Sequence, residues 1–275
     1  RDYYASRGLG DVYKRQIMNL SFDLINIKDY KSKSQRARVL TENWMELNMF
    51  CPVCGKLILK HYQANRPVAD FFCEECKSEY ELKSQEKKKS SFPNIIPDGC
   101  YDTMIQRINS LNNPHLFVMT HYNQQVNNLI FIPNFFFTPA IIIKRPQLKE
   151  SARRAGWVGC NINIGAVPAD AKISIIADGK LTSIQRIVNN YNRLLSLRTD
   201  KLQNRGWLMD AMNCIDLIHS ESFSLKDICQ YVDMLKIKHP TNNHIKDKLR
   251  QQLQILRDKG FIEFTSRGNY RKVIL

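Results

Sequence analysis

The spacing of apolar residues predicts a mixed α/β domain in the first two thirds of the chain. Residues 32–49 and 184–197 carry apolar side chains at helical spacing, with polar residues on the opposite face. Short apolar or alternating runs between these helices are typical of strands, at residues 68–72, 79–83, 116–122, 128–133 and 172–177. Strands and helices mixed in this way indicate an α/β core.

A polar segment interrupts the strand pattern. Residues 85–97 are rich in lysine and serine and predict a loop. Asp98 follows the loop, and we expect it to cap a helix over residues 99–111.

After residue 198 the pattern changes to helices followed by a hairpin. A first helix is predicted at residues 207–219, and Ser224 caps a second, with Asp227 in the capping-box position. Asn242 or Asn243 would cap a third helix that runs to about Lys259. Two strand patterns, at residues 261–264 and 270–274, flank a basic turn. Three helices and such a hairpin are typical of a winged helix-turn-helix with the third helix as recognition helix.

These patterns divide the chain into two domains, at residues 18–198 and 199–275. We interpret residues 1–17 as a non-native extension, because Met18 has the character of a natural start and no signal-peptide core precedes it.

The charge balance favours a polyanionic partner. The chain has 41 Lys and Arg against 26 Asp and Glu, a formal net charge of +15. Such an excess favours nucleic acid first and an anionic membrane surface second. No apolar run approaches the 18 or so residues that span a bilayer, so we expect no membrane segment. Eight cysteines without a secretion signal favour a reducing compartment.

Two cysteine pairs have the spacing of a zinc site. Cys51 and Cys54 form one C-x-x-C pair, and Cys73 and Cys76 form the second, 18 residues later. Four thiolates close a tetrahedral shell and leave no position for a substrate. We therefore expect zinc with a structural role.

The second cysteine pair lies between residues with the layout of a metal-dependent nuclease site. Asp70 and Glu81 can supply carboxylates from two adjacent strands, and the carbonyl of Leu82 is a third candidate oxygen ligand. Glu81 and Lys83 are two residues apart, so on a strand they share one face. A divalent metal with a lysine beside it suits phosphodiester cleavage. Taken alone, this pattern also fits a solvated strand edge.

These residues resemble the PD-(D/E)xK nuclease superfamily, and within it the DpnI-like family of methyl-directed type II restriction endonucleases. Ala69 stands where the superfamily has proline before the metal-binding aspartate. The likeness is carried by the four cysteines and by residues 66–71, 81–84, 152–157, 159–162, 242–246 and 250–259.

The resemblance implies a nuclease domain with a zinc insertion, followed by a winged helix. It implies magnesium-dependent cleavage of double-stranded DNA at GATC sites whose adenine is methylated, by a monomer in a prokaryotic cytoplasm. Asp70, Glu81 and Leu82 would hold magnesium, Lys83 would assist the attacking water, and Trp157 would lie in a DNA-reading surface.

Candidate DNA contacts fall in two places. The N-terminal residues of a recognition helix read base edges, and basic residues around it meet phosphates. Trp157 follows two arginines in a glycine-bracketed polar loop, where contact with DNA is favoured over packing in the core. The residues expected to contact DNA are Arg153, Arg154, Trp157, Asn242, Asn243, His244, Lys246, Lys248, Arg250 and Arg267.

Two other hypotheses stay open. A zinc site with a winged helix also suits a non-catalytic DNA-binding regulator. A nuclease of the same fold without methyl dependence would carry the same acidic residues and lysine.

Overall fold

The computed structural model describes residues 18–24, 30, 32–62, 69–88 and 91–273. The prediction that residues 1–17 are foreign lies outside these residues. So do positions 66–68 of the family likeness and the end of the last predicted strand at Ile274.

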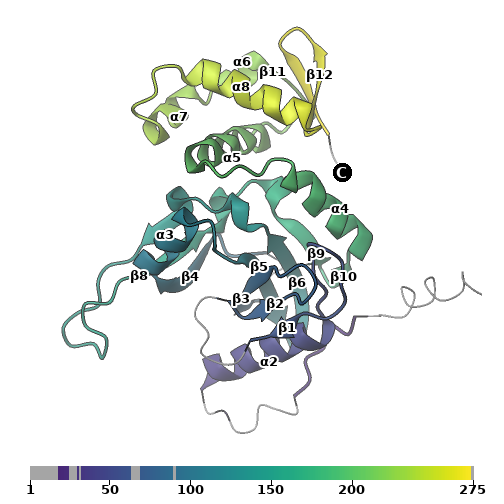
Figure 1. Cartoon of the computed structure of the whole chain (residues 1–275), viewed down its shortest axis with the longest axis vertical. Coiled ribbons are helices and arrows are strands. Elements are labelled where there is room, and N and C mark those ends of the chain that lie inside the picture. The colour runs from purple at the N-terminus through teal and green to yellow at the C-terminus, as the bar shows by residue number, and fades with distance from the viewer. Residues whose placement is uncertain (1–17, 25–29, 31, 63–68, 89–90, 274–275) are drawn as a thin grey trace, which may run out of the picture.

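A seven-stranded mixed sheet forms the centre of the first domain (Figure 1). Its order is β1-β2-β3-β5-β6-β9-β10, in which only β3 and β5 are parallel. The strands are β1 Lys60–His61, β2 Phe71–Phe72, β3 Glu79–Glu86, β5 His115–Tyr122, β6 Gln125–Ile132, β9 Ile173–Ala177 and β10 Lys180–Leu181.

Two helices cover one face of this sheet. The Thr41 hydroxyl of α2 (Lys33–Asn48) lies 3.2 Å from the Ser84 hydroxyl of β3. Tyr191 of α4 (Ile184–Leu195) packs against His115 and Phe131. Tyr80 and Ser84 share a face of β3 by strand alternation, and Tyr80 stacks on Phe117 within the same aromatic cluster.

A second sheet and a short helix lie over the opposite face. This sheet has the order β4-β8-β7, with β4 Ile95–Cys100, β8 Gly159–Asn163 and β7 Ile142–Lys144. Helix α3 (Tyr101–Asn109) reaches the central sheet through Arg107, whose guanidinium lies 3.8 Å from Glu79. Short 3-10 helices complete the domain at Asn134–Phe136, Pro139–Ile141, Ile164–Ala166 and Ala169–Ala171.

The polar segment at residues 85–97 is shorter than its sequence predicts. Strand β3 runs on to Glu86, and β4 begins at Ile95. Asp98 lies within β4 and caps no helix, because α3 begins at Tyr101 with Cys100 as its N-cap. The prediction for Asp98 is therefore wrong. Local cap signals could not reveal that residues 95–100 pair with β8.

The C-terminal domain has a helix-turn-helix and a three-stranded sheet with the order β11-β13-β12. Its elements are α5 Leu202–Asp216, β11 Ser222–Ser224, α6 Leu225–Cys229, α7 Val232–Lys238, α8 Ile245–Asp258, β12 Ile262–Ser266 and β13 Asn269–Lys272. Helix α8 precedes the β12–β13 hairpin, as expected for a winged helix.

Two capping predictions have opposite outcomes. The capping box of Ser224 and Asp227 is confirmed at α6. The predicted cap of α8 is wrong, because His244 is the N-cap, with no side-chain cap bond. Asn242 instead accepts a 2.7 Å hydrogen bond from the backbone N–H of His244. The predicted second helix is divided into α6 and α7.

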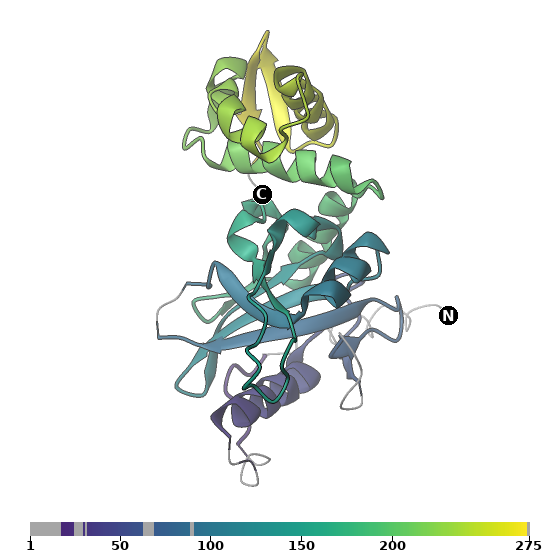
Figure 2. The same ribbon diagram turned by 90° about the vertical axis from the view of Figure 1, so that its left-hand side faces the viewer.

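Helix α5 lies at the junction of the two domains (Figure 2). Asn213 donates to the Ala166 carbonyl at 2.9 Å, and Asp216 accepts from the Ala169 N–H at 2.8 Å. Arg193 of α4, also in the first domain, donates to the carbonyl of Gly260, which follows α8, at 2.7 Å. None of the described helices has both the length and the apolar character needed to cross a bilayer.

Candidate active site and metal centre

Asp70 is held against the edge of β3, immediately before β2. Its backbone N–H donates to the Tyr80 carbonyl at 2.9 Å, and its carboxylate accepts from the Leu82 N–H at 2.8 Å. The N–H and C=O of one strand residue leave on the same side. The Leu82 carbonyl therefore faces the edge of β3 at which Asp70 lies, and Asp70, Glu81 and Leu82 bring their oxygens to one region.

Glu81 and Lys83 share the face of β3 under the second sheet, as predicted. The Lys83 Nζ lies 2.6 Å from Glu81 Oε1, and the two side chains are 21% and 14% exposed. Burial raises the pKa of Glu81 to about 7, with Asp98 and Asp70 adding to the rise and Lys83 opposing it. Burial lowers the pKa of Lys83, but Glu81 and Asp98 raise it by more, so the ammonium stays charged.

Sequence reasoning missed one residue of this cluster. Asp98 Oδ1 also lies 2.6 Å from Lys83 Nζ, and the Asp98 side chain is 6% exposed. The only sequence signal was an acidic residue beside an apolar run, Ile95-Ile96, which also fits a helix cap. The pairing of β4 with β8 could not be inferred from that run.

The oxygen groups fit a hard divalent cation. Carboxylates and a backbone carbonyl are the ligands that magnesium takes in proteins. Burial is the main cause of the raised pKa of Glu81. A cation at this edge would favour the ionised carboxylate, and Lys83 would place a second positive charge beside a bound phosphate.

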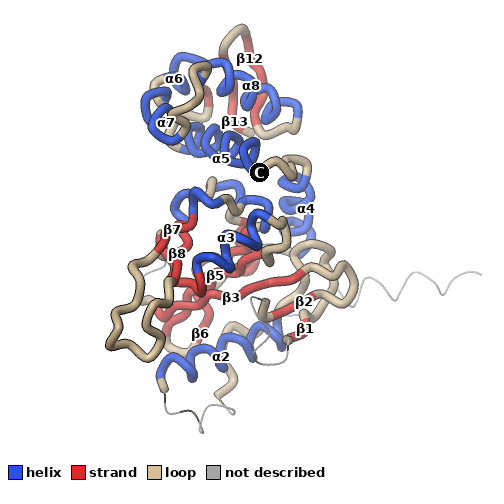
Figure 3. Tube along the Cα trace, turned by 60° about the vertical axis from the view of Figure 1, so that its left-hand side comes forward, coloured by secondary structure: helices blue, strands red, loops and turns tan. Residues whose placement is uncertain are grey.

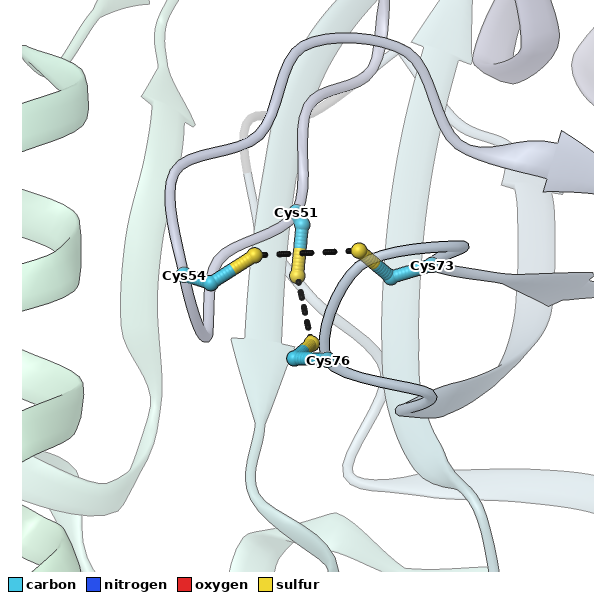
Figure 4. A group of neighbouring side chains, drawn as sticks. All are labelled: Cys51, Cys54, Cys73 and Cys76. Carbon is cyan, nitrogen blue, oxygen red and sulfur yellow. Dashed lines mark hydrogen bonds between the residues drawn. The ribbon is translucent and has the colours of Figure 1, made fainter.

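The four predicted zinc ligands meet at one point (Figure 4). Their Sγ atoms all lie within 4.8 Å of one another, with Cys51 and Cys76 at 3.5 Å and Cys54 and Cys73 at 3.7 Å. Tetrahedral zinc with bonds of about 2.3 Å would place sulfurs about 3.8 Å apart. The cluster therefore has the size of a zinc–thiolate site.

The zinc ligands come from two segments, one before and one after Asp70 in the sequence. Cys51 and Cys54 follow α2, while Cys73 and Cys76 form the turn between β2 and β3. Burial raises the pKa of the Cys51 thiol. A bound cation would favour its deprotonated form, as in structural zinc sites.

A long loop between β7 and β8 carries the predicted DNA contacts of the first domain and extends from its body (Figure 3). Trp157 is half-buried, and the guanidiniums of Arg154 and Arg145 lie 4.5 Å and 5.4 Å from its ring centre. Arg153 and Arg154 are exposed. Arg145 also donates to the Asp98 carbonyl at 3.0 Å, so it joins this loop to β4. Sequence reasoning missed this role of Arg145.

The predicted contacts of the winged helix divide into two groups. Around the start of α8, Asn243, His244 and Lys246 are exposed together, and Arg267 is exposed on the hairpin turn. The remaining three have partners within the domain. Asn242 binds the His244 N–H, Lys248 donates to Gln251, and Arg250 pairs with Asp247 at 2.9 Å. Lys248 also lines a cavity with residues 196–199, at the domain junction.

Comparison with known families agrees with this architecture. A model of the Dam-replacing family matches residues 18–200, and a model of the Dam-replacing HTH domain matches residues 203–272. The chain belongs to the Dam-replacing family. It is therefore a nuclease of the DpnI-like, methyl-dependent restriction type with a C-terminal helix-turn-helix domain. The predicted family and mixed α/β fold are confirmed, and the four-cysteine cluster that could hold zinc is present.

Proposed function

We propose that this Dam-replacing family chain is a type II restriction endonuclease that cleaves double-stranded DNA at GATC sites carrying methylated adenine, with magnesium as cofactor. The observation that supports the proposal is that Asp70, immediately before β2, accepts from the Leu82 N–H of β3, while Lys83 pairs with Glu81 on the same strand. A non-catalytic regulator has no need of a buried lysine–carboxylate cluster of this kind.

Three groups would hold the magnesium ion: the carboxylates of Asp70 and Glu81 and the carbonyl of Leu82. Bound there, the ion would neutralise charge on the phosphate and lower the pKa of the attacking water. The Lys83 ammonium is held beside Glu81 Oε1 and would orient that water and the phosphate.

The zinc ligands Cys51, Cys54, Cys73 and Cys76 would have a structural role. They cross-link the segment after α2 to the turn between β2 and β3. This turn connects Asp70 to Glu81, so a closed zinc–thiolate site would keep the two carboxylates in register.

Methylation of adenine removes one hydrogen-bond donor and adds an apolar group, so part of the discrimination must come from apolar contact. The ring of Trp157 offers such a surface between two arginines. At the winged helix, Asn243 suits an adenine edge, and Lys246 suits guanine. We propose that both domains, residues 18–198 and 199–275, read the site. The protein would act as a monomer in a prokaryotic cytoplasm, where DNA entering the cell is accessible.

One assay tests the proposal. The same plasmid is prepared from adenine-methylating and non-methylating hosts and incubated with the protein and magnesium. We expect cleavage of the methylated plasmid alone, with fragments that map to GATC. The Asp70→Asn variant should bind the methylated plasmid and fail to cleave it. Glu46→Gln changes an exposed carboxylate on α2 and should cleave like the unmodified chain.

The other hypotheses give different results in this assay. Equal cleavage of both plasmids would remove the methyl requirement and favour the same-fold nuclease. Binding without cleavage by the unmodified chain, in magnesium or manganese, would favour a regulator. Fragments that map elsewhere would contradict the GATC assignment alone.

A further inference from the structure

The Lys83 ammonium is bound by two carboxylates that come from different sheets. Glu81 Oε1 and Asp98 Oδ1 each lie 2.6 Å from Nζ. Glu81 belongs to β3 in the central sheet, whereas Asp98 belongs to β4 in the second sheet. Lys83 therefore links the two layers of the domain at the candidate active site.

Burial of the Asp98 carboxylate should destabilise the fold, and the place of Asp98 in β4 alone does not explain this burial. Its Oδ2 atom is buried and has no hydrogen-bond partner among the residues the structure describes. A buried carboxylate oxygen without a partner destabilises a protein. The β4–β8 pairing shifts register between Asp98 and Cys100, and such irregularities commonly redirect a side chain next to an active site.

Asp98 is separate from the proposed magnesium ligands. In the part of the chain that the structure describes, only the four cysteines gather three or more His, Cys, Asp or Glu side chains closely enough for one ion. In this structure the carboxylates of Asp70, Glu81 and Asp98 are therefore not gathered closely enough for one ion. The ion pair that the Asp98 carboxylate makes in this region is with Lys83.

Lys83 has space to move if it is not held. Its side chain borders a cavity of about 240 Å³ lined in part by Pro93, Ile96 and Val118. Glu81 cannot be the only group that holds the Lys83 ammonium during the reaction. A carboxylate that binds magnesium shares its charge with the ion and binds the ammonium less strongly. Asp98 is not one of the proposed magnesium ligands, so its contact with Lys83 does not compete with the metal.

We propose that Asp98 is a positioning residue that holds the Lys83 ammonium against the reacting phosphate while Glu81 binds the metal. The inference rests on the proposed nuclease function. It assigns to Asp98 an effect on the rate of the chemical step, exerted through Lys83, and no direct contact with metal or DNA.

Kinetics of Asp98→Asn and Asp98→Ala test this role. Single-turnover cleavage of methylated DNA should slow about 10- to 100-fold, because a displaced catalytic group costs that much. The DNA affinity measured in calcium and the magnesium concentration at half-maximal rate should each change less than about 3-fold. Asp102→Asn, an exposed carboxylate at the start of α3, is the matched control and should cleave normally.

A double-mutant cycle separates action through Lys83 from independent action. In a Lys83→Ala background, Asp98→Asn should slow cleavage by less than about 2-fold further. An equal slowing in both backgrounds would overturn the proposal. A large rise in the magnesium requirement that persists without Lys83 would make Asp98 a metal ligand and would also overturn it.

A readout without cleavage keeps this inference separate from the proposed function. The reaction of Lys83 with an amine-specific acylating reagent is followed by peptide mass spectrometry in the absence of metal and DNA. In Asp98→Asn, once circular dichroism has shown that it is folded, acylation of Lys83 should be at least 5-fold faster relative to that of the exposed Lys144. Asp102→Asn should leave this ratio unchanged.

Unchanged acylation in both Asp98 variants would overturn the proposal, even if the unmodified chain cleaves as expected. If the unmodified chain does not cleave, the proposed function fails, and faster acylation still establishes that Asp98 restrains Lys83.

Discussion

The Tyr80 hydroxyl lies 2.9 Å from Cys51 Sγ, and Tyr80 immediately precedes Glu81 on β3. Adjacent strand residues point to opposite faces, so β3 contacts the cysteine cluster with one side and the candidate active site with the other. Tyr80 is completely buried and stacks on Phe117 in the core. The cysteine cluster and the carboxylates are thus attached to the same rigid strand.

Loss of one zinc ligand should therefore destabilise the fold together with the activity. We expect Cys73→Ser to lower the melting temperature strongly and to reduce bound zinc from one equivalent to nearly none. Apparent zinc-binding energies of such sites are about 10–16 kcal/mol, so a loss of several kcal/mol in stability is expected. Thermal unfolding by circular dichroism and zinc release measured with a colorimetric chelator provide the two readouts.

Cys229→Ser is the control for this prediction, because Cys229 is a half-buried thiol outside the cluster. It should retain zinc and melt within a few degrees of the unmodified chain. Full zinc content and stability in Cys73→Ser would show that the cluster does not hold the metal.

A side chain at Gly159 should displace Arg145. A Cβ at this position would lie 2.1 Å from the Arg145 guanidinium, which binds the Asp98 carbonyl and contacts Trp157. Gly159→Ala should displace Arg145 and slow cleavage about 10- to 100-fold, the usual cost of disturbing an active site by about 1 Å. Single-turnover cleavage measures the effect.

Gly99→Ala is the comparison on the neighbouring strand. An added Cβ there meets nothing within 4 Å, so this variant should cleave at close to the normal rate. Equal rates for the two alanine variants would argue against a role for Arg145.

The exposed basic residues of the winged helix should determine how DNA binding depends on salt. Arg267→Ala should lower the slope of log K against log salt concentration by about 0.9, the value for one lost phosphate contact. Lys180→Ala, exposed on β10 of the other domain, should leave the slope unchanged. Fluorescence anisotropy over a salt series gives these slopes. Equal slopes for the two variants would remove Arg267 from the phosphate contacts.

His115 should make the fold sensitive to acid. Burial lowers its pKa to about 3, with Arg198 contributing, and its Nδ1 accepts from the Asn134 N–H. The unfolded chain, with a histidine pKa of about 6.5, gains this proton first as the pH falls. The stabilising contribution is therefore complete above pH 6.5 and is lost by about 1.4 kcal/mol per pH unit as the pH falls towards 3.

Urea unfolding at pH 7 and pH 5 measures this contribution. Between pH 7 and pH 5, the free energy of unfolding of the unmodified chain should fall by about 2 kcal/mol more than that of His115→Asn. His219→Asn, at an exposed position, should lose as much as the unmodified chain. If His115→Asn shows the same pH dependence as the unmodified chain, His115 is not the titrating group.

Local signals in the sequence predicted much of this structure. The two C-x-x-C pairs located the cysteine cluster, and two-residue alternation placed Glu81 and Lys83 on one face. The capping box at Ser224 depends only on neighbouring residues, and it is confirmed. Each of these inferences rests on spacing within a single element or on a motif with known chemistry.

Residues whose roles depend on pairing between distant segments were not predicted. Asp98 follows a proline and precedes a glycine, which is also the context of a helix cap, and its position in β4 results from pairing with β8. Arg145 meets the Asp98 carbonyl across 47 positions of sequence. The partners in these contacts are fixed by the packing of two sheets, which no local pattern encodes.

The contacts of Arg145 constrain how this protein can change its target. One side chain lies over Trp157 and also binds the backbone that carries Asp98, whose carboxylate holds Lys83. A substitution in the loop that suits a different base will also shift the lysine, unless Arg145 keeps both contacts. Variants selected for a new recognition sequence should therefore retain Arg145 and Gly159, and altered specificity without slower cleavage should arise first from changes in the winged helix.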